Sequence, residues 1–235
     1  MEQKEAARAA SLHTVGNYKA RNSVITTLTK YDLIEKCTAN SWNIYSLPNH
    51  KEILSDFKIT YDAITKKTLL TDELENTWDN YFDQALPIIK GFQVLGLGNK
   101  KLVGSTVNRG DSEGVVKAMG LQEDLNKLND GTTTPVNWTT KFLGVASTNQ
   151  GDEAGKNQYA VNAAIIWILK IGENHHGFDF MEIVGEGYQG EAEITFPMGV
   201  KVKITSVKTH ISDLQATLRP NGCKKAKYTI YGEIF

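Results

Sequence analysis

The sequence predicts an α+β fold in which helices come first and two packed, mostly antiparallel sheets follow. Two observations support this. Up to about residue 90, apolar residues recur at steps of three and four, the spacing of a helix that buries one face. Beyond that point, short apolar runs alternate with turn-rich segments, as in a series of strands. Helices that precede strands as a block are typical of α+β proteins.

Three helices are expected in the first half. They follow residues 1–20, which we expect to be a mobile arm and of which residues 1–10 are charged and Ala-rich. Asp72 is the expected cap of the third helix, with Glu75 three residues later, and Pro87 is expected to end that helix. We expect residues 21–235 to form a single domain. The periodic apolar residues of the three helices are Val24, Leu28, Tyr31 and Ile34; Ile53, Phe57, Tyr61 and Ile64; and Leu74, Trp78, Tyr81 and Ala85.

The second half is expected to consist mostly of strands, with at least one helix within residues 111–129. The segments 129–134 and 148–157, rich in Asn, Asp, Gly and Thr, are expected to be loops. The expected strands are 92–97, 101–107, 142–146, 160–169, 191–196, 200–207 and 228–234.

Composition narrows the function classes. The net charge of −1 does not indicate the broad basic surface that nucleic-acid-binding proteins carry. The longest apolar stretch, residues 159–171, is too short to span a bilayer, and residues 1–10 lack the apolar core of a cleavable signal peptide. Export without such a signal, or as part of a larger polypeptide, stays open.

The Cys and His residues give no metal pattern. Cys37 and Cys223 are far apart in sequence and are expected to be free thiols, although a disulfide between them stays open. His175 and His176 lack a spaced third ligand, so no metal site is expected.

A pair of glutamates, Glu191 and Glu193, stands where a Gly-rich loop enters a strand. Residues i and i+2 of a strand point to the same face, so the two carboxylates are expected to project side by side. This arrangement suits an active site, although a solvated acidic edge is the plainer alternative.

Two further motifs precede this pair. Arg109-Gly110 closes one expected strand, and Ser147-Thr148 closes another. Each alone is more typical of a salt bridge or a turn. Their order along the chain, followed by Glu191-Ala192-Glu193, carries more information than any one of them.

Together these motifs resemble the mono-ADP-ribosyltransferases of the arginine–serine–glutamate class, which includes bacterial toxins and effectors. Tyr188, three residues before Glu191, matches the aromatic residue of that family's loop before the catalytic strand. The sequence departs from the family at Asn149, where a Ser is usual, and at Asn108, where an aromatic residue is frequent. The resemblance covers residues 102–207 and implies that residues 21–235 form one catalytic domain with an NAD cleft.

The resemblance also implies roles on the NAD side. Glu193 would stabilise the oxocarbenium-like ribose and hold a ribose hydroxyl, and Ser147 would fix the Glu193 rotamer. Arg109 would contact the pyrophosphate. Gly110 would let the backbone approach the nicotinamide amide. Thr148 would shape the nicotinamide pocket. NAD would be the substrate, with no metal.

On the target side, the resemblance implies that Glu191 engages the incoming nucleophile and Tyr188 contacts the target protein. Glu at the first position of the pair points to arginine as the acceptor. The expected partner is a protein of a host or competitor cell, with actin as one possible target, besides a possible delivery or immunity partner. The expected location is that of a secreted or injected effector acting in the target-cell cytosol, with no nucleic acid and no membrane span.

Two other functions stay open. A glycoside hydrolase could use Glu191 and Glu193 as its acid and base, but that reaction gives no role to Arg109 or Ser147. A non-catalytic NAD- or protein-binding module is the third candidate.

Overall fold

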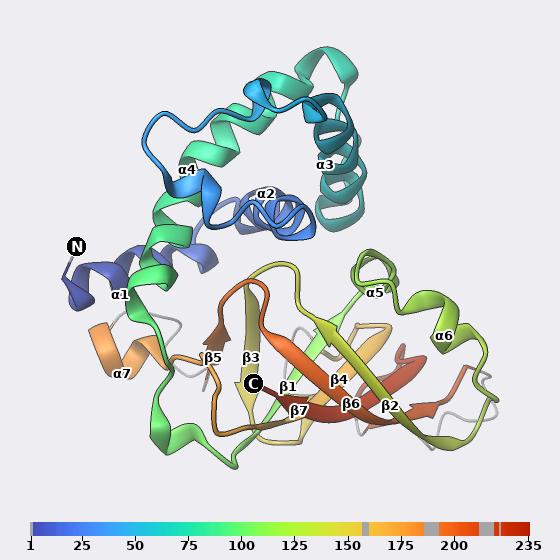
Figure 1. The fold of residues 1–235 in the computed structure, drawn as a ribbon. Helices are drawn as coiled ribbons and strands as arrows, with labels where there is room; N and C mark the ends of the chain where they lie inside the picture. The colour runs from blue at the N-terminus through green and yellow to red at the C-terminus, as the bar shows by residue number, and fades with distance from the viewer. Residues whose placement is uncertain (1, 157–159, 186–192, 212–218, 221) are drawn as a thin grey trace.

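The computed structural model describes residues 2–156, 160–185, 193–211, 219–220 and 222–235. Four helices gather on one side of the molecule, the sheet with two short helices lies on the other, and a third short helix lies beside the first helix (Figure 1). The predicted α+β class, helices first and strands afterwards, is confirmed. The α-helices are α1 (Gln3–Ser11), α2 (Tyr18–Lys30), α3 (His50–Thr65), α4 (Leu74–Leu95), α5 (Glu113–Ala118), α6 (Gln122–Asn126) and α7 (Phe180–Val184).

The helical layer is built on the three predicted periodic segments, which form α2, α3 and α4. Leu28, Phe57 and Trp78 are buried in the centre of this layer. The Phe57 and Trp78 rings meet edge to face with centroids 5.1 Å apart, the arrangement that the aromatic quadrupoles favour.

Helix α4 departs from the prediction at both ends. It begins after a 3-10 turn over Thr71–Glu73, and Asp72 is not its cap. It also continues through Pro87 to Leu95, so the predicted end at Pro87 and the predicted strand at 92–97 are wrong. Ile88, Ile89 and Phe92, all buried, lie beyond the proline. Their burial, about 1.5–3 kcal/mol each, offsets the cost of about 3 kcal/mol for an interior proline.

The N-terminal segment is not the mobile arm that the sequence predicts. Residues 3–11 form α1, which packs along α4 with Ala6, Ala7 and Ala10 fully buried. Facing them on α4 is Gly91. The small side chains allow the two backbones to approach closely, which explains how an Ala-rich segment with a weak apolar pattern becomes part of the core.

The strands form one seven-stranded sheet in the order β2-β6-β7-β4-β1-β3-β5. All neighbouring strands are antiparallel except β4 and β7, so the mostly antiparallel prediction is confirmed. The expected two sheets are joined into one by a short ladder between β1 and β3. The strands are β1 (Thr106–Asp111), β2 (Thr133–Lys141), β3 (Ala146–Gln150), β4 (Ile165–Ile171), β5 (Glu193–Phe196), β6 (Lys201–Thr209) and β7 (Tyr228–Ile234).

Several strand boundaries differ from the prediction. Strand β2, at the edge of the sheet, was not expected, because its Thr, Asn and Pro residues carry little apolar signal. Strand β1 starts only at Thr106, after a 3-10 turn over Lys100–Leu102. Strands β3 and β4 also begin later than expected. The predictions at 200–207 and 228–234, and of helix within 111–129, are confirmed.

No helix within the described ranges is long and apolar enough to cross a membrane. Cys37 and Cys223 are buried free thiols, as predicted.

The close contact between α1 and α4 predicts that one added methyl group at Gly91 lowers the stability of the protein. A Cβ at Gly91 would lie 2.6 Å from the Ala6 carbonyl oxygen and 2.8 Å from the Ala10 nitrogen, so Gly91→Ala must push the helices apart. We expect a loss of about 1–3 kcal/mol in the free energy of unfolding, measured by chemical denaturation.

The matched control is Gly114→Ala in α5, where the added methyl would meet its nearest neighbour, Ala63 Cβ, at 3.5 Å. This variant should be as stable as the wild type or more stable, because alanine favours a helix over glycine by about 1 kcal/mol. Equal losses in both variants would contradict the packing of α1 on α4.

Candidate functional site

Three neighbouring strands bring together side chains that are far apart in the sequence. Strands β1, β3 and β5 lie side by side, with Asn108 opposite Asn149 and Asn149 opposite Glu193. Ser147 lies two residues from Asn149 and therefore diagonally across from Glu193, within reach of its side chain. Arg109, Ser147 and Glu193 thus meet at one place on the sheet, although Arg109 and Ser147 lie within their strands and not at the strand ends.

The Glu193 carboxylate is held through one of its oxygens. The Ser147 hydroxyl donates a hydrogen bond to Oε1, and the Thr195 hydroxyl donates another at 3.4 Å. His13 Nε2 lies 3.5 Å from the same oxygen. Burial raises the pKa of Glu193, but the contacts from His13 and Ser147 outweigh burial and hold the pKa of this carboxyl below its usual value. The side chain is therefore a carboxylate at neutral pH.

Arg109 is fixed by three contacts. Its Nε and one Nη donate to the two oxygens of Asp111, both at 2.8 Å, and its other Nη donates to the Ser147 carbonyl oxygen at 3.0 Å. Its guanidinium also lies 5.5 Å from the centroid of the Phe142 ring. A guanidinium has five N–H donors, so two have no partner among the described residues and can bind a ligand. The sequence prediction missed Asp111, although its i+2 spacing from Arg109 places both on one strand face.

The other predicted site residues divide into three groups. Gly110 lines the cleft beside Arg109. Thr148 does not reach the cleft, because its side chain is buried and its hydroxyl donates to the Ile194 carbonyl oxygen at 2.7 Å. Glu191 and Tyr188 lie outside the described residues.

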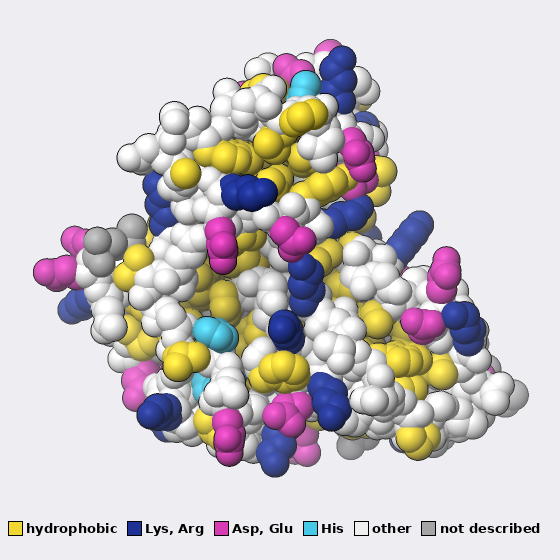
Figure 2. Space-filling view, in the orientation of Figure 1, with side chains coloured by type: hydrophobic (Ala, Val, Ile, Leu, Met, Phe, Trp, Pro, Cys, Tyr) yellow, Lys and Arg dark blue, Asp and Glu magenta, His cyan; other side chains and the backbone are white. Residues whose placement is uncertain are grey.

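The cleft has a volume of about 770 Å³ and lies between the helical layer and the sheet. Lys and Arg side chains run down the middle of this face (Figure 2). This excess of positive charge suits an anionic ligand. The basic residues that line the cleft are Lys19, Arg21, Lys30, Lys66, Arg109 and Lys117, and the acidic ones are Asp56, Asp111 and Glu193.

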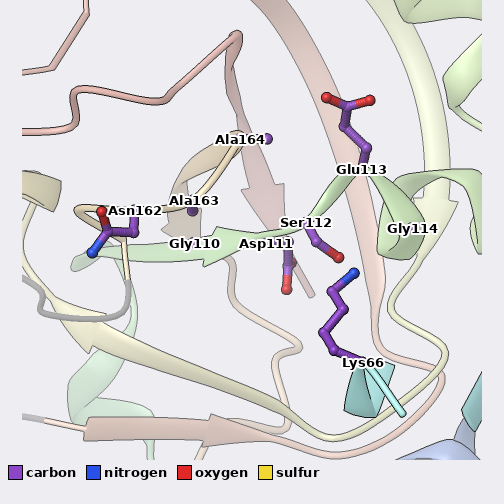
Figure 3. A pocket seen from close by; sticks show the side chains of 9 residues that line it. All are labelled: Lys66, Gly110, Asp111, Ser112, Glu113, Gly114, Asn162, Ala163 and Ala164. Carbon is purple, nitrogen blue, oxygen red and sulfur yellow. The ribbon is translucent and has the colours of Figure 1, made fainter. Parts of the chain in front are cut away.

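A smaller pocket of about 440 Å³ adjoins the cleft at the end of β1. Figure 3 shows Lys66, at the end of α3, and Ser112 pointing toward each other beside Asp111, while Glu113 points away. Lys66, Asp111 and Ser112 also line the main cleft. The pocket therefore extends the cleft past the end of β1.

The helical layer is attached to the sheet directly before Ser147. Asn22 of α2 accepts a hydrogen bond from the Val145 backbone N–H at 2.9 Å. The adjacent Gly144 leaves room for this contact, since a Cβ there would lie 2.4 Å from the Asn22 amide oxygen. Neither Asn22 nor His13 was predicted, because no local pattern connects them to the motifs.

No group of three His, Cys, Asp or Glu side chains suited to a metal ion occurs in the described part of the chain. The buried side chain of His175 hydrogen-bonds backbone groups through both ring nitrogens and so has a structural role.

Comparison with solved structures identifies the fold. The C-terminal toxin domain of RHS2 from Yersinia entomophaga aligns over 97% of each chain, with a TM-score of 0.61 and 18% identity. Plx2a, an ADP-ribosyltransferase toxin from Paenibacillus larvae, aligns over 100% of this chain and 87% of its own, with a TM-score of 0.48 and 14% identity. The chain shares its fold with the RHS2 toxin domain.

The ATR domain of Salmonella SpvB aligns over 98% of each chain, with a TM-score of 0.45 and 16% identity. No protein-family model and no curated protein sequence matches the chain. The expected fold is confirmed by the order of its elements and by its similarity to the RHS2 toxin domain.

The ion pair between Arg109 and Asp111 predicts that removing the Asp111 carboxylate lowers the stability of the protein. Asp111→Ala leaves a guanidinium that is only 17% exposed without its carboxylate. We expect a loss of about 2 kcal/mol in the free energy of unfolding, less than the 3–5 kcal/mol of a fully buried pair because Arg109 faces the cleft.

The control is Asp124→Ala, which breaks an ion pair with Lys127 whose side chains are 45% and 71% exposed. That change should leave the free energy of unfolding nearly unchanged, because the pair is exposed to solvent. Similar losses for the two variants would show that Arg109 is not held by Asp111.

Proposed function

We propose that this protein transfers ADP-ribose from NAD to an arginine side chain of a target protein, releasing nicotinamide. One observation carries the proposal: Arg109, Ser147 and Glu193 converge in a basic cleft, where Ser147 donates to the Glu193 carboxylate and Arg109 donates to the Ser147 backbone. The shared fold with a toxin domain supports it.

Glu193 carries the central role in the proposed reaction. The bond between the ribose and nicotinamide breaks with both electrons leaving on nicotinamide, and the ribose is left with an oxocarbenium-like charge. A carboxylate already oriented and partly removed from water stabilises that charge without reorganisation. Ser147 and Thr195 bind Oε1, which leaves Oε2 for a ribose hydroxyl.

Arg109 and the lysines of the cleft suit the pyrophosphate of NAD. The two N–H donors of Arg109 that have no partner in the described part of the chain can bind phosphate oxygens, and Asp111 keeps the guanidinium in place. Gly110, without a side chain, would let the nicotinamide amide approach the backbone of β1.

Transfer then needs an acceptor. Glu191 would pair with the guanidinium of the target arginine and remove its proton as the nitrogen attacks the ribose carbon. Tyr188 would contact the target protein. The target is a protein of a host or competitor cell, for which actin is one candidate. A toxin or effector of this kind is secreted or injected and works in the target-cell cytosol, with a delivery or immunity partner.

Labelled NAD incubated with the protein and a cell lysate tests the proposal. We expect a labelled protein band whose modified residue maps to arginine. A label on another residue would correct the acceptor alone. Hydrolysis of glycosides without NAD turnover would favour the glycosidase, and no NAD binding at all would favour the non-catalytic module.

The two glutamates should differ in their roles. Glu193→Gln should abolish both NAD hydrolysis and protein modification, because no carboxylate remains beside the oxocarbenium. Glu191→Gln should lose transfer to arginine and keep hydrolysis. Both activities are measured as nicotinamide release and as label on the target, and parallel loss of both in the two variants would contradict this division.

Arg109→Ala should weaken NAD binding by roughly 10- to 150-fold, the equivalent of a lost charge-assisted contact of about 1.5–3 kcal/mol. Calorimetric titration with NAD measures the change. Arg219→Ala is the control, since Arg219 donates to the Lys224 carbonyl oxygen outside the cleft and should not affect affinity. Unchanged affinity in folded Arg109→Ala would exclude Arg109 as the phosphate ligand.

A further inference from the structure

His13 contacts the candidate active site from the opposite end of the chain. It lies in η1 (Leu12–Thr14), the 3-10 turn that follows α1, and its side chain is only 9% exposed. Its ring packs against Phe92 of α4 and Phe180 of α7, with centroids 6.4 and 6.2 Å away. The imidazole is therefore held in a fixed aromatic setting beside Glu193.

The contacts of the ring fix its tautomer. His13 Nδ1 lies 3.0 Å from the Ala10 carbonyl oxygen, which can only accept a hydrogen bond, so Nδ1 carries a proton. Nε2 is sealed from solvent and has no hydrogen bond of good geometry within the described residues. Its neighbour is Glu193 Oε1 at 3.5 Å.

A proton on Nε2 would make the contact with Glu193 Oε1 favourable. In the neutral ring, the Nε2 lone pair would face a carboxylate oxygen and repel it, whereas an imidazolium would form an ion pair. The neighbouring elements fit this assignment. Helices α4 and α7 present Phe92 and Phe180, and β5 presents Glu193. The Arg21 guanidinium of α2 is directed to backbone carbonyls of residues 12 and 15.

We propose that His13 is a positioning residue for Glu193. An Nε2–H directed at Oε1, together with the Ser147 hydroxyl on the same atom, fixes the carboxylate rotamer and keeps Oε2 directed at the reacting ribose. This inference rests on the proposed function. It makes the N-terminal helix part of the active site, because α1 and its turn bring the imidazole to the sheet.

Steady-state NAD hydrolysis tests the role through two substitutions. His13→Phe preserves an aromatic ring between Phe92 and Phe180 but removes the donor. We expect it to lower kcat roughly 10- to 100-fold, because a slightly misplaced Glu193 carboxylate stabilises the reacting ribose less well. KM for NAD should stay within about threefold of wild type. His13→Gln, whose amide nitrogen can replace Nε2–H, should recover most of that loss.

The control is His50→Phe. His50 makes the same kind of bond, from Nδ1 to the Leu47 carbonyl oxygen at 2.9 Å, and also packs on an aromatic ring, but it lies outside the cleft. Its kcat should equal that of wild type. A kcat loss in His13→Phe that His13→Gln does not recover would overturn the positioning role.

A double-mutant cycle separates this inference from the proposed function. The change in unfolding temperature of the double variant should differ from the sum of the changes in His13→Phe and Glu193→Gln, because the two residues are in contact. Additive shifts would overturn the contact. If the wild type turns over NAD and His13→Phe is equally fast, the role of His13 is overturned and the proposed function is not affected. Absence of NAD cleavage by the wild type, with coupled shifts, would overturn the proposed function.

Discussion

The short ladder between β1 and β3 is the constraint on which the candidate site depends. Only two residue pairs, Val107 with Gln150 and Asn108 with Asn149, join these strands. Arg109 extends the join beyond the ladder by donating to the Ser147 carbonyl oxygen. The same side chain therefore reinforces the join between the two parts of the sheet and faces the cleft, so one guanidinium connects the site to the ladder beside it.

The helical layer contributes as much to the site as the sheet does. Asn22 holds the backbone directly before Ser147, and His13 reaches the carboxylate of Glu193. Both contacts come from the first two helices and their connecting turn. The cleft consequently lies between two layers that both supply its side chains. Because His13 follows α1 directly, its place in the cleft depends on how α1 packs on α4.

Sequence patterns predicted the parts of this arrangement that are local. The motifs predicted Arg109, Ser147 and Glu193, which the structure brings together, because their residue types and their order along the chain are specific. Pro87 misled the prediction, since the penalty of an interior proline is visible locally while the burial that offsets it is tertiary. His13 could not be predicted, because its partner is brought near only by the packing of α1. Strand β2 was missed because an edge strand buries few side chains.

The position of the last strand has a consequence for how the molecule is made. Strand β7 lies inside the sheet, pairing in parallel with β4 on one side and antiparallel with β6 on the other. During synthesis, β2 and β6 therefore have no strand pairing with the rest of the sheet until β7 has been made. Such non-local pairing slows folding. The nascent chain cannot close its sheet early, and a chain interrupted before β7 would leave two unpaired strand edges open to aggregation.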